Sequence, residues 1–431
     1  MSEKNLPKES IIRLMTRMAN EHKAINLSQG FTDRPIIFEM LWGLFKAAVG
    51  GTENRARAIE TLTMSNIAEE LGYNIEDFMK ISLKDIISQL QGKEDVYNQY
   101  SYPFGLVEMR DAVADYTERF QGYKPNPEKE ITIVSGATEG IFIVMQTICD
   151  PGDEVIVIQP FHEMYPSQAL FSGIVPKYIT LRQNGEKTAW DFDFEEFENS
   201  ITDKTKAFIF NTPHNPTGKV FTCKEIEEIC RICKKHDINI ISDEIYEHIL
   251  FTDTKHYSIA AFEGMRERTF VVNSISKTGN STGWRIGWVI SPEEYTSKLR
   301  GIHDTMVMQA PTPLQKGAVE LLKMPDEFYS KLPSKYKSCC TKLITALKDK
   351  GFDVIFPEGS YYLFADYSNV PILKELSPME ASEYLIKQIG VASVPGDNFY
   401  KIGSYGDKSI RFAFCRSTKS IEEAANRLIR L

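Results

Sequence analysis

Short apolar segments that each end in polar residues recur through the middle of this 431-residue chain. From about residue 95 onward they alternate with stretches in which apolar residues return every three or four positions, as on one face of a helix. The segments are ITIVSG, EVIVIQP, KAFIFN, INIISDE and TFVVNS. This alternation predicts an α/β fold with a mainly parallel central sheet and helices on both faces. Ligands on such sheets bind beyond the carboxyl ends of the strands, so the polar residues there are the candidates for a site.

The same pattern divides the chain into four parts. We expect a large α/β domain over residues 94–310 and a smaller α+β domain over 311–431, where GFDVIFPEGSYYLFADYS and KSIRFAFCR are typical of antiparallel strands. Residues 1–47 are expected to form an N-terminal arm that packs with the small domain. Residues 48–93 hold two or three helical patterns broken by GG and LGYN, which indicates an insertion. It is either a surface decoration or a lid over the site.

Charge and hydropathy disfavour several classes of protein. The formal net charge of −9 argues against broad nucleic-acid binding, which needs a basic face. No stretch approaches the roughly 18 apolar residues of a membrane span, and the N-terminus has no apolar core of signal-peptide length, so we expect a cytosolic protein. The seven cysteines are then reduced thiols. We expect no metal, because Cys223, Cys230, Cys233 and His236 fall in one amphipathic helical segment, whereas structural zinc takes ligands from separated turns.

The segment VSGATEG, residues 134–140, has the composition of a phosphate cradle. A predicted strand ends at Ser135-Gly136 and a helix begins at Ala137-Thr138. Glycine lets an anion approach the backbone, and the free amides of a helix start favour negative charge. Many strand-to-helix turns share this composition, and the lysine of a nucleotide-binding P-loop is missing, so the segment does not specify a nucleotide.

A second loop, SISKTGNSTGWRIG at residues 274–287, contains one lysine, one arginine and no acidic residue. A desolvated lysine has a lowered pKa and becomes a nucleophilic amine, which is the role we predict for Lys277. Ser274, Ser276 and Arg285 supply donors for a phosphate, and an arginine can bind one through two parallel hydrogen bonds.

Two further strand ends supply a carboxylate, a phenol and an amide. In ISDEIYEHI, Asp243 ends a buried apolar run, where its carboxylate requires a cationic partner, and Tyr246 lies one turn further. In NTPHNPTGK, two prolines stiffen the loop that holds Asn215. An amine, a phosphate cradle, a buried aspartate and a phenol are the groups that pyridoxal phosphate requires.

With these motifs in place, the chain resembles the class I/II pyridoxal-phosphate-dependent aminotransferases of fold type I, in particular the kynurenine/glutamine transaminase and bacterial aromatic or methionine aminotransferase branch. The resemblance covers nearly the whole chain outside the insertion, and its motifs occur in the family's order: NLSQGF, YNQYSYPFG, SGATEG, NTPHNPTGKVF, SDEIY, SISKTGNSTGWRIGW, APTPLQ and IRFAF. It implies a homodimeric enzyme that moves the amino group of an L-amino acid to a 2-oxo acid.

The resemblance also implies roles for individual residues. Lys277 would form the internal aldimine and shuttle a proton, Asp243 would hold the pyridine nitrogen protonated, and Tyr246 and Asn215 would bind the 3′-oxygen. Arg411, in IRFAF, would bind the substrate carboxylate together with Asn215 and the backbone near Gly30. The remaining cofactor-binding residues would be Gly136, Ala137, Thr138, His162, Ser274, Ser276 and Arg285, joined by Tyr100 from a partner subunit.

Three departures from the family's pattern bear on the substrate. His162 stands where the family usually has an aromatic residue that stacks on the cofactor. Gly279 also stands where the family usually has an aromatic residue, and its small size should leave room near the cofactor. Asp33 and Arg34 add charge to the loop expected on the substrate side. Two alternatives therefore stay open: a cyclase, lyase or oxidase with the same cofactor, and a non-catalytic ligand sensor. The sensor is disfavoured because the roughly 25 residues before NLSQGF are too few for a DNA-binding domain of ordinary size.

Overall fold

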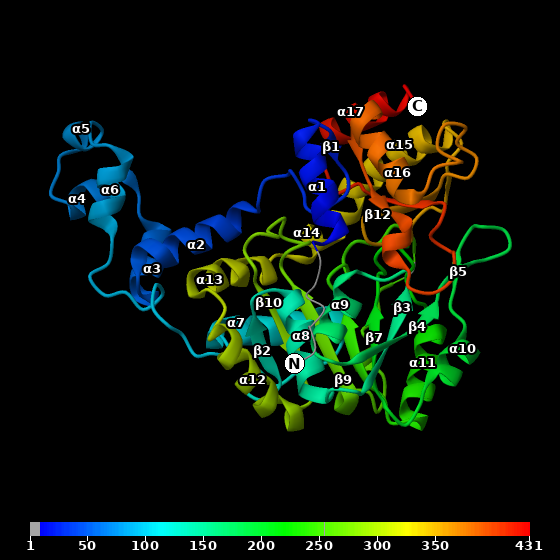
Figure 1. The fold of residues 1–431 in the computed structure, drawn as a ribbon. Coiled ribbons are helices and arrows are strands. Elements are labelled where there is room, and N and C mark those ends of the chain that lie inside the picture. The colour runs from blue at the N-terminus through cyan, green and yellow to red at the C-terminus, as the bar shows by residue number, and fades with distance from the viewer. Residues whose placement is uncertain (1–8, 254) are drawn as a thin grey trace, which may run out of the picture.

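The computed structural model describes residues 9–253 and 255–431 (Figure 1). Its centre is a seven-stranded sheet in the order β2-β10-β9-β8-β7-β3-β4. Neighbouring strands run parallel except at β10, which is antiparallel to both β2 and β9. The strands are β2 (Ile131–Val134), β3 (Glu154–Gln159), β4 (Val175–Thr180), β7 (Thr205–Asn211), β8 (Asn239–Asp243), β9 (Thr269–Ser274) and β10 (Gly287–Ile290). The predicted α/β fold with a mainly parallel sheet is confirmed.

Helices cover both faces of this sheet because successive residues of each strand point to opposite sides. On β7, Ala207 and Ile209 face one hydrophobic cluster, while Phe208 and Phe210 face another. The first cluster is closed by α8 (Ala137–Ile148), α9 (Met164–Phe171) and α12 (Glu293–Val307). The opposite face is covered by α7 (Val107–Gln121), α10 (Phe194–Ser200), α11 (Cys223–Lys235) and α13 (Thr312–Leu322).

A second, antiparallel sheet has the order β11-β12-β15-β14. Its strands are β11 (Asp353–Val354), β12 (Tyr362–Asp366), β14 (Val394–Pro395) and β15 (Ser409–Ala413). The helices packed with it are α15 (Leu332–Lys348), α16 (Pro378–Tyr384) and α17 (Thr418–Leu428). Short elements elsewhere are α14 (Asp326–Ser330), β5 (Arg182–Gln183), β6 (Trp190–Asp191), η1 (Ile259–Ala261), η2 (Arg266–Arg268), η3 (Leu385–Ile389) and η4 (Gly396–Phe399).

The N-terminal helix α1 (Ile11–Glu21) lies against this smaller unit, where Met15 and Ala19 pack on Ile386 and Ala392. The strand β1 (Ile25–Asn26) pairs in parallel with β13 (Val391–Ala392). Because of these contacts, the segment that follows β1 lies at the carboxyl ends of the strands of the large sheet, where Gly30 lines a pocket.

Two helices near the expected domain boundaries belong to the core of the large sheet. Met40 of α2 (Phe38–Gly50) and Leu321 of α13 lie in one cluster with Ile133 and Trp288 of the sheet. Their buried contacts place residues 38–50 and 312–322 with the large unit, not with an N-terminal arm or the small unit.

Four helices of the insertion project from the body of the molecule (Figure 1). They are α3 (Glu53–Thr61), α4 (Met64–Glu70), α5 (Ile75–Phe78) and α6 (Leu83–Leu90). The sequence predicted two or three helices; there are four because Thr52, Thr63, Asn74 and Ser82 each accept a backbone hydrogen bond as an N-cap. Their side chains form a small hydrophobic cluster of their own around Phe78.

Among the described residues, no helix is both long and apolar enough to cross a bilayer. Cys230 and Cys233 pack in the core on α11, and His236 at its end contacts Glu198 at 3.0 Å. A cytosolic location stays a prediction.

Candidate active site

A pocket of about 450 Å³ lies where the carboxyl ends of the parallel strands meet the smaller unit. It brings together most of the predicted site residues, although they come from segments spread along the whole chain. Those that line it are Gly30, Ala137, Thr138, His162, Asn215, Tyr246, Ser274, Ser276, Lys277, Arg285 and Arg411.

Lys277 lies in the loop after β9 with its amine directed into the pocket. Its Nζ donates to the carbonyl oxygen of Gly30 at 3.1 Å and lies over the rings of Tyr246 and Tyr361. Burial lowers the pKa of Lys277 to about 8. About a tenth of this amine is therefore uncharged at pH 7, far more than for an ordinary lysine, and the uncharged form is the one a nucleophile requires.

Asp243 lies behind the pocket at the end of β8 and is buried. Its Oδ2 accepts from the hydroxyl of Tyr165 at 2.6 Å, and burial raises the pKa of Asp243 to about 6. Its Oδ1 accepts from the Ile245 amide at 3.4 Å, so both of its donors are neutral, and a buried carboxylate of this kind favours a cationic neighbour. Tyr246, whose pKa burial raises well above its ordinary value, keeps its proton and contacts the Tyr362 hydroxyl at 3.2 Å.

The turn between β2 and α8 forms a cradle with Arg285. Gly136 has a φ of +84°, and a Cβ built on it would lie 2.4 Å from Nη2 of Arg285. Only glycine therefore allows the guanidinium to reach the N-terminus of α8. Across the cradle, the buried hydroxyl of Ser276 has no hydrogen-bond partner, and Ser274 Oγ accepts from the Ser276 amide at 3.3 Å. Free amides, an unpartnered hydroxyl and a guanidinium fit the phosphate of pyridoxal phosphate.

Arg411 lies on β15 and is 1% exposed. Its Nη1 donates to Asn215 Oδ1 at 3.1 Å and its Nη2 to the Ser28 carbonyl oxygen at 2.7 Å, whereas its Nε has no partner. The rings of Tyr362 and Phe399 lie on the guanidinium. Within the described part of the chain, this buried cation pairs with no carboxylate. Such a charge is costly unless a ligand supplies the anion.

His162 lies in the pocket with its ring edge-on to Tyr165. Burial, together with the charges of Arg411 and Lys277, lowers the pKa of His162 to about 3, so the ring is neutral. Its Nδ1 is buried without a partner.

Tyr100 is not brought to this pocket. Its side chain is 77% exposed and lies in a surface hollow with Val96, Tyr102 and Val107. Within one chain, therefore, Tyr100 contributes nothing to the cradle.

The departures at Gly279, Asp33 and Arg34 have structural reasons that the sequence did not reveal. A Cβ on Gly279 would lie 2.8 Å from Met40 Sδ and 3.0 Å from Leu321 Cδ2, so this glycine admits the helices behind the loop and leaves no room near the cofactor. Asp33 accepts from Ser417, the N-cap of α17, and Arg34 donates to the Arg416 carbonyl oxygen. Neither lines the pocket, so the expected charge on the substrate-side loop is corrected.

Sequence reasoning missed several tyrosines of the site. Tyr165 holds Asp243, Tyr361 donates to the Gly30 carbonyl oxygen at 3.0 Å, and a Cβ on Gly30 would lie 1.9 Å from the Tyr362 hydroxyl. The sequence offered one signal for Tyr165, because it follows the predicted site residue His162 by three residues. Tyr361 and Tyr362 lie in a predicted strand with nothing to mark them.

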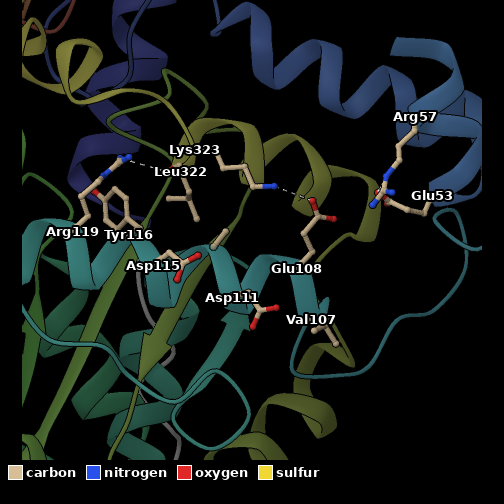
Figure 2. A pocket seen from close by; sticks show the side chains of 11 residues that line it. Glu53, Arg57, Val107, Glu108, Asp111, Asp115, Tyr116, Arg119, Leu322 and Lys323 are labelled. Carbon is tan, nitrogen blue, oxygen red and sulfur yellow. Dashed lines mark hydrogen bonds and ion pairs between the residues drawn. The ribbon is translucent and has the colours of Figure 1, made fainter. Parts of the chain in front are cut away.

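A second cavity, of about 750 Å³, lies between α3, α7 and the end of α13 (Figure 2). Its cations are already paired: Lys323 with Glu108 at 3.3 Å, Arg57 with Glu53 at 3.0 Å, and Arg119 with Asp326 at 3.4 Å. It therefore lacks the unpaired charges of the first pocket.

Beneath the sheet ends, Glu244, Glu247 and His256 form a buried cluster. Its carboxylate oxygens already accept from Ser242, Ser258, Tyr116 and Asn273, and His256 Nε2 lies 3.0 Å from Glu244 Oε2. Because its oxygens are engaged, we regard the cluster as an internal hydrogen-bond network.

Comparison with known proteins agrees with this geometry. The family model for aminotransferase class I and II matches residues 69–428. Methionine aminotransferase of Escherichia coli is 30% identical, with 98% of this chain and 96% of the relative covered. Human kynurenine–oxoglutarate transaminase 1 is 29% identical, with 96% and 93% covered. The structure of N-succinyldiaminopimelate aminotransferase from Mycobacterium tuberculosis superposes with a TM-score of 0.83 at 28% identity, covering 97% of this chain and 96% of that one.

The fold, the pocket at the carboxyl ends of the strands and these matches agree with one another. The chain therefore belongs to the class I and II aminotransferases, enzymes of fold type I that transfer amino groups and depend on pyridoxal phosphate.

Proposed function

We propose that this enzyme holds pyridoxal phosphate on Lys277 and transfers the amino group of an L-amino acid to a 2-oxo acid. The observation that carries the proposal is Arg411, a buried guanidinium without a carboxylate partner among the described residues, in the same pocket as an amine of lowered pKa. Arg411 can bind a carboxylate, which the substrates of such a transfer supply. Lys277 can react with an aldehyde, which the cofactor supplies.

The residues around the cofactor divide its binding among them. Arg285, Ser274, Ser276 and the first amides of α8, at Ala137 and Thr138, would hold the phosphate. Asp243, supported by Tyr165, would bind the ring nitrogen, Asn215 and Tyr246 would bind the 3′-oxygen, and His162 would stack on the ring. When bound, the cofactor supplies a conjugated ring that draws electrons from the substrate Cα–H bond and stores the amino group between the two half-reactions.

Lys277 also moves the proton. Its amine is held by the Gly30 carbonyl and lies between the rings of Tyr246 and Tyr361, which exclude water. In its uncharged form it can accept the proton from the substrate Cα and return it elsewhere, as a positioned general base does. Tyr246 stays protonated and donates a hydrogen bond without competing for that proton.

Arg411 orients the substrate. Its two terminal nitrogens are held by Asn215 and the Ser28 carbonyl, and the rings of Tyr362 and Phe399 fix its plane. A carboxylate bound to this fixed fork holds the Cα–H bond in one orientation. Phe31, Met164 and Ile245 give the pocket apolar walls. Together with relatives named for kynurenine and methionine, these walls support an amino donor with an apolar or aromatic side chain.

We further propose that the active enzyme is a homodimer in which Tyr100 completes the neighbouring subunit's phosphate site. Its side chain is exposed in one chain and close to a hollow lined by apolar residues. Helices α3–α6 contribute no residue to the pocket of their own chain, so any lid function of residues 48–93 would act on the neighbouring copy.

The half-reactions test the proposal. Adding donor amino acids to the loaded enzyme should convert the cofactor stoichiometrically to pyridoxamine phosphate, and a 2-oxo acid should reverse the conversion; chromatography of the released cofactor measures both. Borohydride reduction followed by peptide mapping should place the cofactor on Lys277. Sustained product formation without any 2-oxo acid would instead support a cyclase, lyase or oxidase.

Mixed subunits test the dimer. Lys277→Ala and Tyr100→Phe chains, each of low activity, are refolded together. If Tyr100 acts across the interface, about half of the dimers carry both chains and one native site each, so activity recovers to about a quarter of wild type. If Tyr100 acts within its own chain, no native site forms and activity does not recover.

A further inference from the structure

A buried carboxylate lies beside the phosphate cradle, in the first turn of α8. Gly136 is the N-cap of this helix, and Glu139 is the acidic residue of its first turn. Its Oε2 accepts from the backbone amide of Ser135 at 2.5 Å, so the carboxylate is directed back toward the turn that contains Gly136. Burial lowers the pKa of Arg285 and the charge of Glu139 acts in the opposite direction, which places this carboxylate within electrostatic reach of the guanidinium.

Glu139 and a bound phosphate would compete for the same positive charges. The N-terminus of a helix attracts anions, and Arg285 is the cation that the cradle adds to it. Two anions at one helix start repel each other, and a buried carboxylate without a counter-charge is costly even before a phosphate arrives. The cradle can therefore hold a phosphate tightly only if the charge of Glu139 is balanced from another side.

His303 of α12 provides this balance. Its side chain is fully buried and lies between two hydrogen-bond acceptors. Its Nδ1 lies 2.5 Å from Glu139 Oε1, and its Nε2 donates to the Pro103 carbonyl oxygen at 2.9 Å. Because a carbonyl oxygen only accepts, Nε2 carries a proton, and a second proton lies between Nδ1 and Oε1. Whichever of these two atoms holds that proton, Glu139 and His303 together carry no net charge.

The contact between α8 and α12 does not need an ionisable pair. The two helices also pack through apolar side chains, among them Ile143, Leu299 and Ile302. A buried pair of this kind is often no more stabilising than apolar residues of the same volume. Neither Glu139 nor His303 lines the pocket, so the pair contacts neither the substrate nor the cofactor ring. Its place beside the cradle therefore indicates an electrostatic role there.

We propose that His303 is a positioning residue for the phosphate site: by neutralising Glu139 it lets the cradle of Arg285 and α8 prefer a phosphorylated cofactor over its unphosphorylated form. The inference rests on the proposed function, because it takes this cradle as the phosphate site of pyridoxal phosphate. His303 acts through Glu139 and does not touch the phosphate. Without His303, the carboxylate keeps its full charge beside the phosphate, whereas an aldehyde that lacks the phosphate does not experience this repulsion.

The test measures the Kd of the apoenzyme for pyridoxal phosphate and for pyridoxal by absorbance titration. His303→Gln leaves Glu139 unbalanced, so the preference for pyridoxal phosphate should fall about tenfold, through the Kd of pyridoxal phosphate alone. The double variant Glu139→Gln/His303→Gln removes both charges and should restore the preference to within about threefold of wild type. His256→Gln is the matched control, because it breaks a second histidine–carboxylate pair, with Glu244 at 3.0 Å, whose side chains do not line the pocket.

The preference between the two aldehydes separates an electrostatic role from a structural one. A histidine that only supports the fold would weaken both aldehydes equally, so an unchanged preference in His303→Gln would overturn the proposal. A fall of the same size in His256→Gln would overturn it too. If His303→Gln does not fold but the double variant folds and keeps the wild-type preference, the charge balance at Glu139 is supported. If neither folds, His303 is structural and the proposal fails.

The wild-type apoenzyme distinguishes failure of this inference from failure of the proposed function, since binding requires no turnover. If the wild type binds both aldehydes equally tightly, the cradle is not a phosphate site, and both proposals fail there. If the wild type prefers pyridoxal phosphate and His303→Gln keeps that preference, only the role of His303 is wrong.

Discussion

At the scale of single residues, the main feature of the pocket is that its ionisable side chains are buried with few partners. Lys277 is the clearest case, because burial moves its pKa from 10.5 to about 8. Below pH 8 the folded apoenzyme holds a protonated, non-nucleophilic amine, and above it a free one. The rate of pyridoxal phosphate attachment to the apoenzyme should therefore rise with pH and level off above an inflection near pH 8. Absorbance stopped-flow from pH 6.5 to 9.5 measures this, and a rate that still rises tenfold per pH unit up to pH 9.5, as for an amine of ordinary pKa, would contradict it.

Arg411 acts through the plane of its guanidinium, so a lysine cannot replace it. Arg411→Lys keeps the charge but loses the paired donors that meet Asn215, Ser28 and the substrate. We expect kcat/KM to fall by an amount that corresponds to a rise of about 2–4 kcal/mol in activation free energy, while the cofactor content stays unchanged. Steady-state kinetics beside cofactor quantitation measure the two. A loss below threefold would mean that the carboxylate binds elsewhere.

Gly136 decides whether Arg285 can reach the phosphate cradle. In Gly136→Ala, the new Cβ meets the guanidinium at 2.4 Å, so the arginine is displaced and the Kd for pyridoxal phosphate should rise at least about tenfold. Gly122→Ala is the matched control. Gly122 also has a positive φ, +78°, but a Cβ there meets nothing within 4 Å. Both variants carry backbone strain of about 1–3 kcal/mol, the larger at Gly136, whose ψ of 161° is nearly exclusive to glycine, and only Gly136→Ala should weaken the cofactor. Equal Kd values for the two would refute this reading.

At the scale of elements, the insertion enters and leaves the fold at one place. The Val96 amide donates to the Gly51 carbonyl oxygen at 2.7 Å, and the Gly92 amide to that of Val49 at 3.0 Å. Replacing residues 53–91 with a two-residue linker should therefore leave the fold intact. Lys316 loses Glu53 but keeps Glu108 as a partner.

For that shortened protein we expect stoichiometric cofactor, because the removed residues contribute nothing to the pocket of their own chain. If the helices cover a neighbouring copy's pocket, KM for the best donor should change while cofactor affinity does not. Absorbance gives the cofactor content and initial rates give KM. Unchanged kinetics would make the insertion a surface decoration, and lost cofactor would mean that it supports the pocket indirectly.

At the scale of the whole molecule, the buried cluster beneath the sheet ends links stability to pH. Burial lowers the pKa of His256, but the hydrogen bond to Glu244 and the charges of Glu244 and Glu247 together outweigh it, so the pKa is raised. Burial raises the pKa of Glu247. Both groups bind protons more tightly when folded. Their contribution to the free energy of unfolding is thus fully present below the ordinary pKa of each group and is lost as pH rises through the folded value.

His256→Gln should lower the free energy of unfolding at pH 6 by about 1–3 kcal/mol, since it removes a charged hydrogen bond to a buried carboxylate. The difference from wild type should be smaller at pH 8.5 than at pH 6, because the wild-type histidine loses its proton as pH rises. Urea unfolding at both pH values measures it, and His236→Gln, at a partly exposed ion pair on the protein surface, serves as control. A difference that grows with pH would show that the cluster is held together in another way.

The sequence by itself determined the local parts of this protein. Alternating periodicities fixed the strands and helices, and capping residues such as Thr222 fixed where helices begin. The polar strand ends at Asp243, Ser274 and Lys277 could be read because the carboxyl ends of parallel strands meet at one edge. Such signals depend on neighbours in the chain, and for that reason they survive without knowledge of packing.

Only the tertiary structure decided which distant residues meet. Gly279 admits Met40 and Leu321, Asp33 accepts from Ser417 at the start of α17, and Tyr165 supports Asp243, none of which the local pattern distinguishes. Arg411 differs from any strand arginine only because the smaller unit folds over the sheet and buries it without a carboxylate partner among the described residues. The physical reason is that a side chain's pKa, burial and partners depend on elements far away in sequence, which only packing brings together.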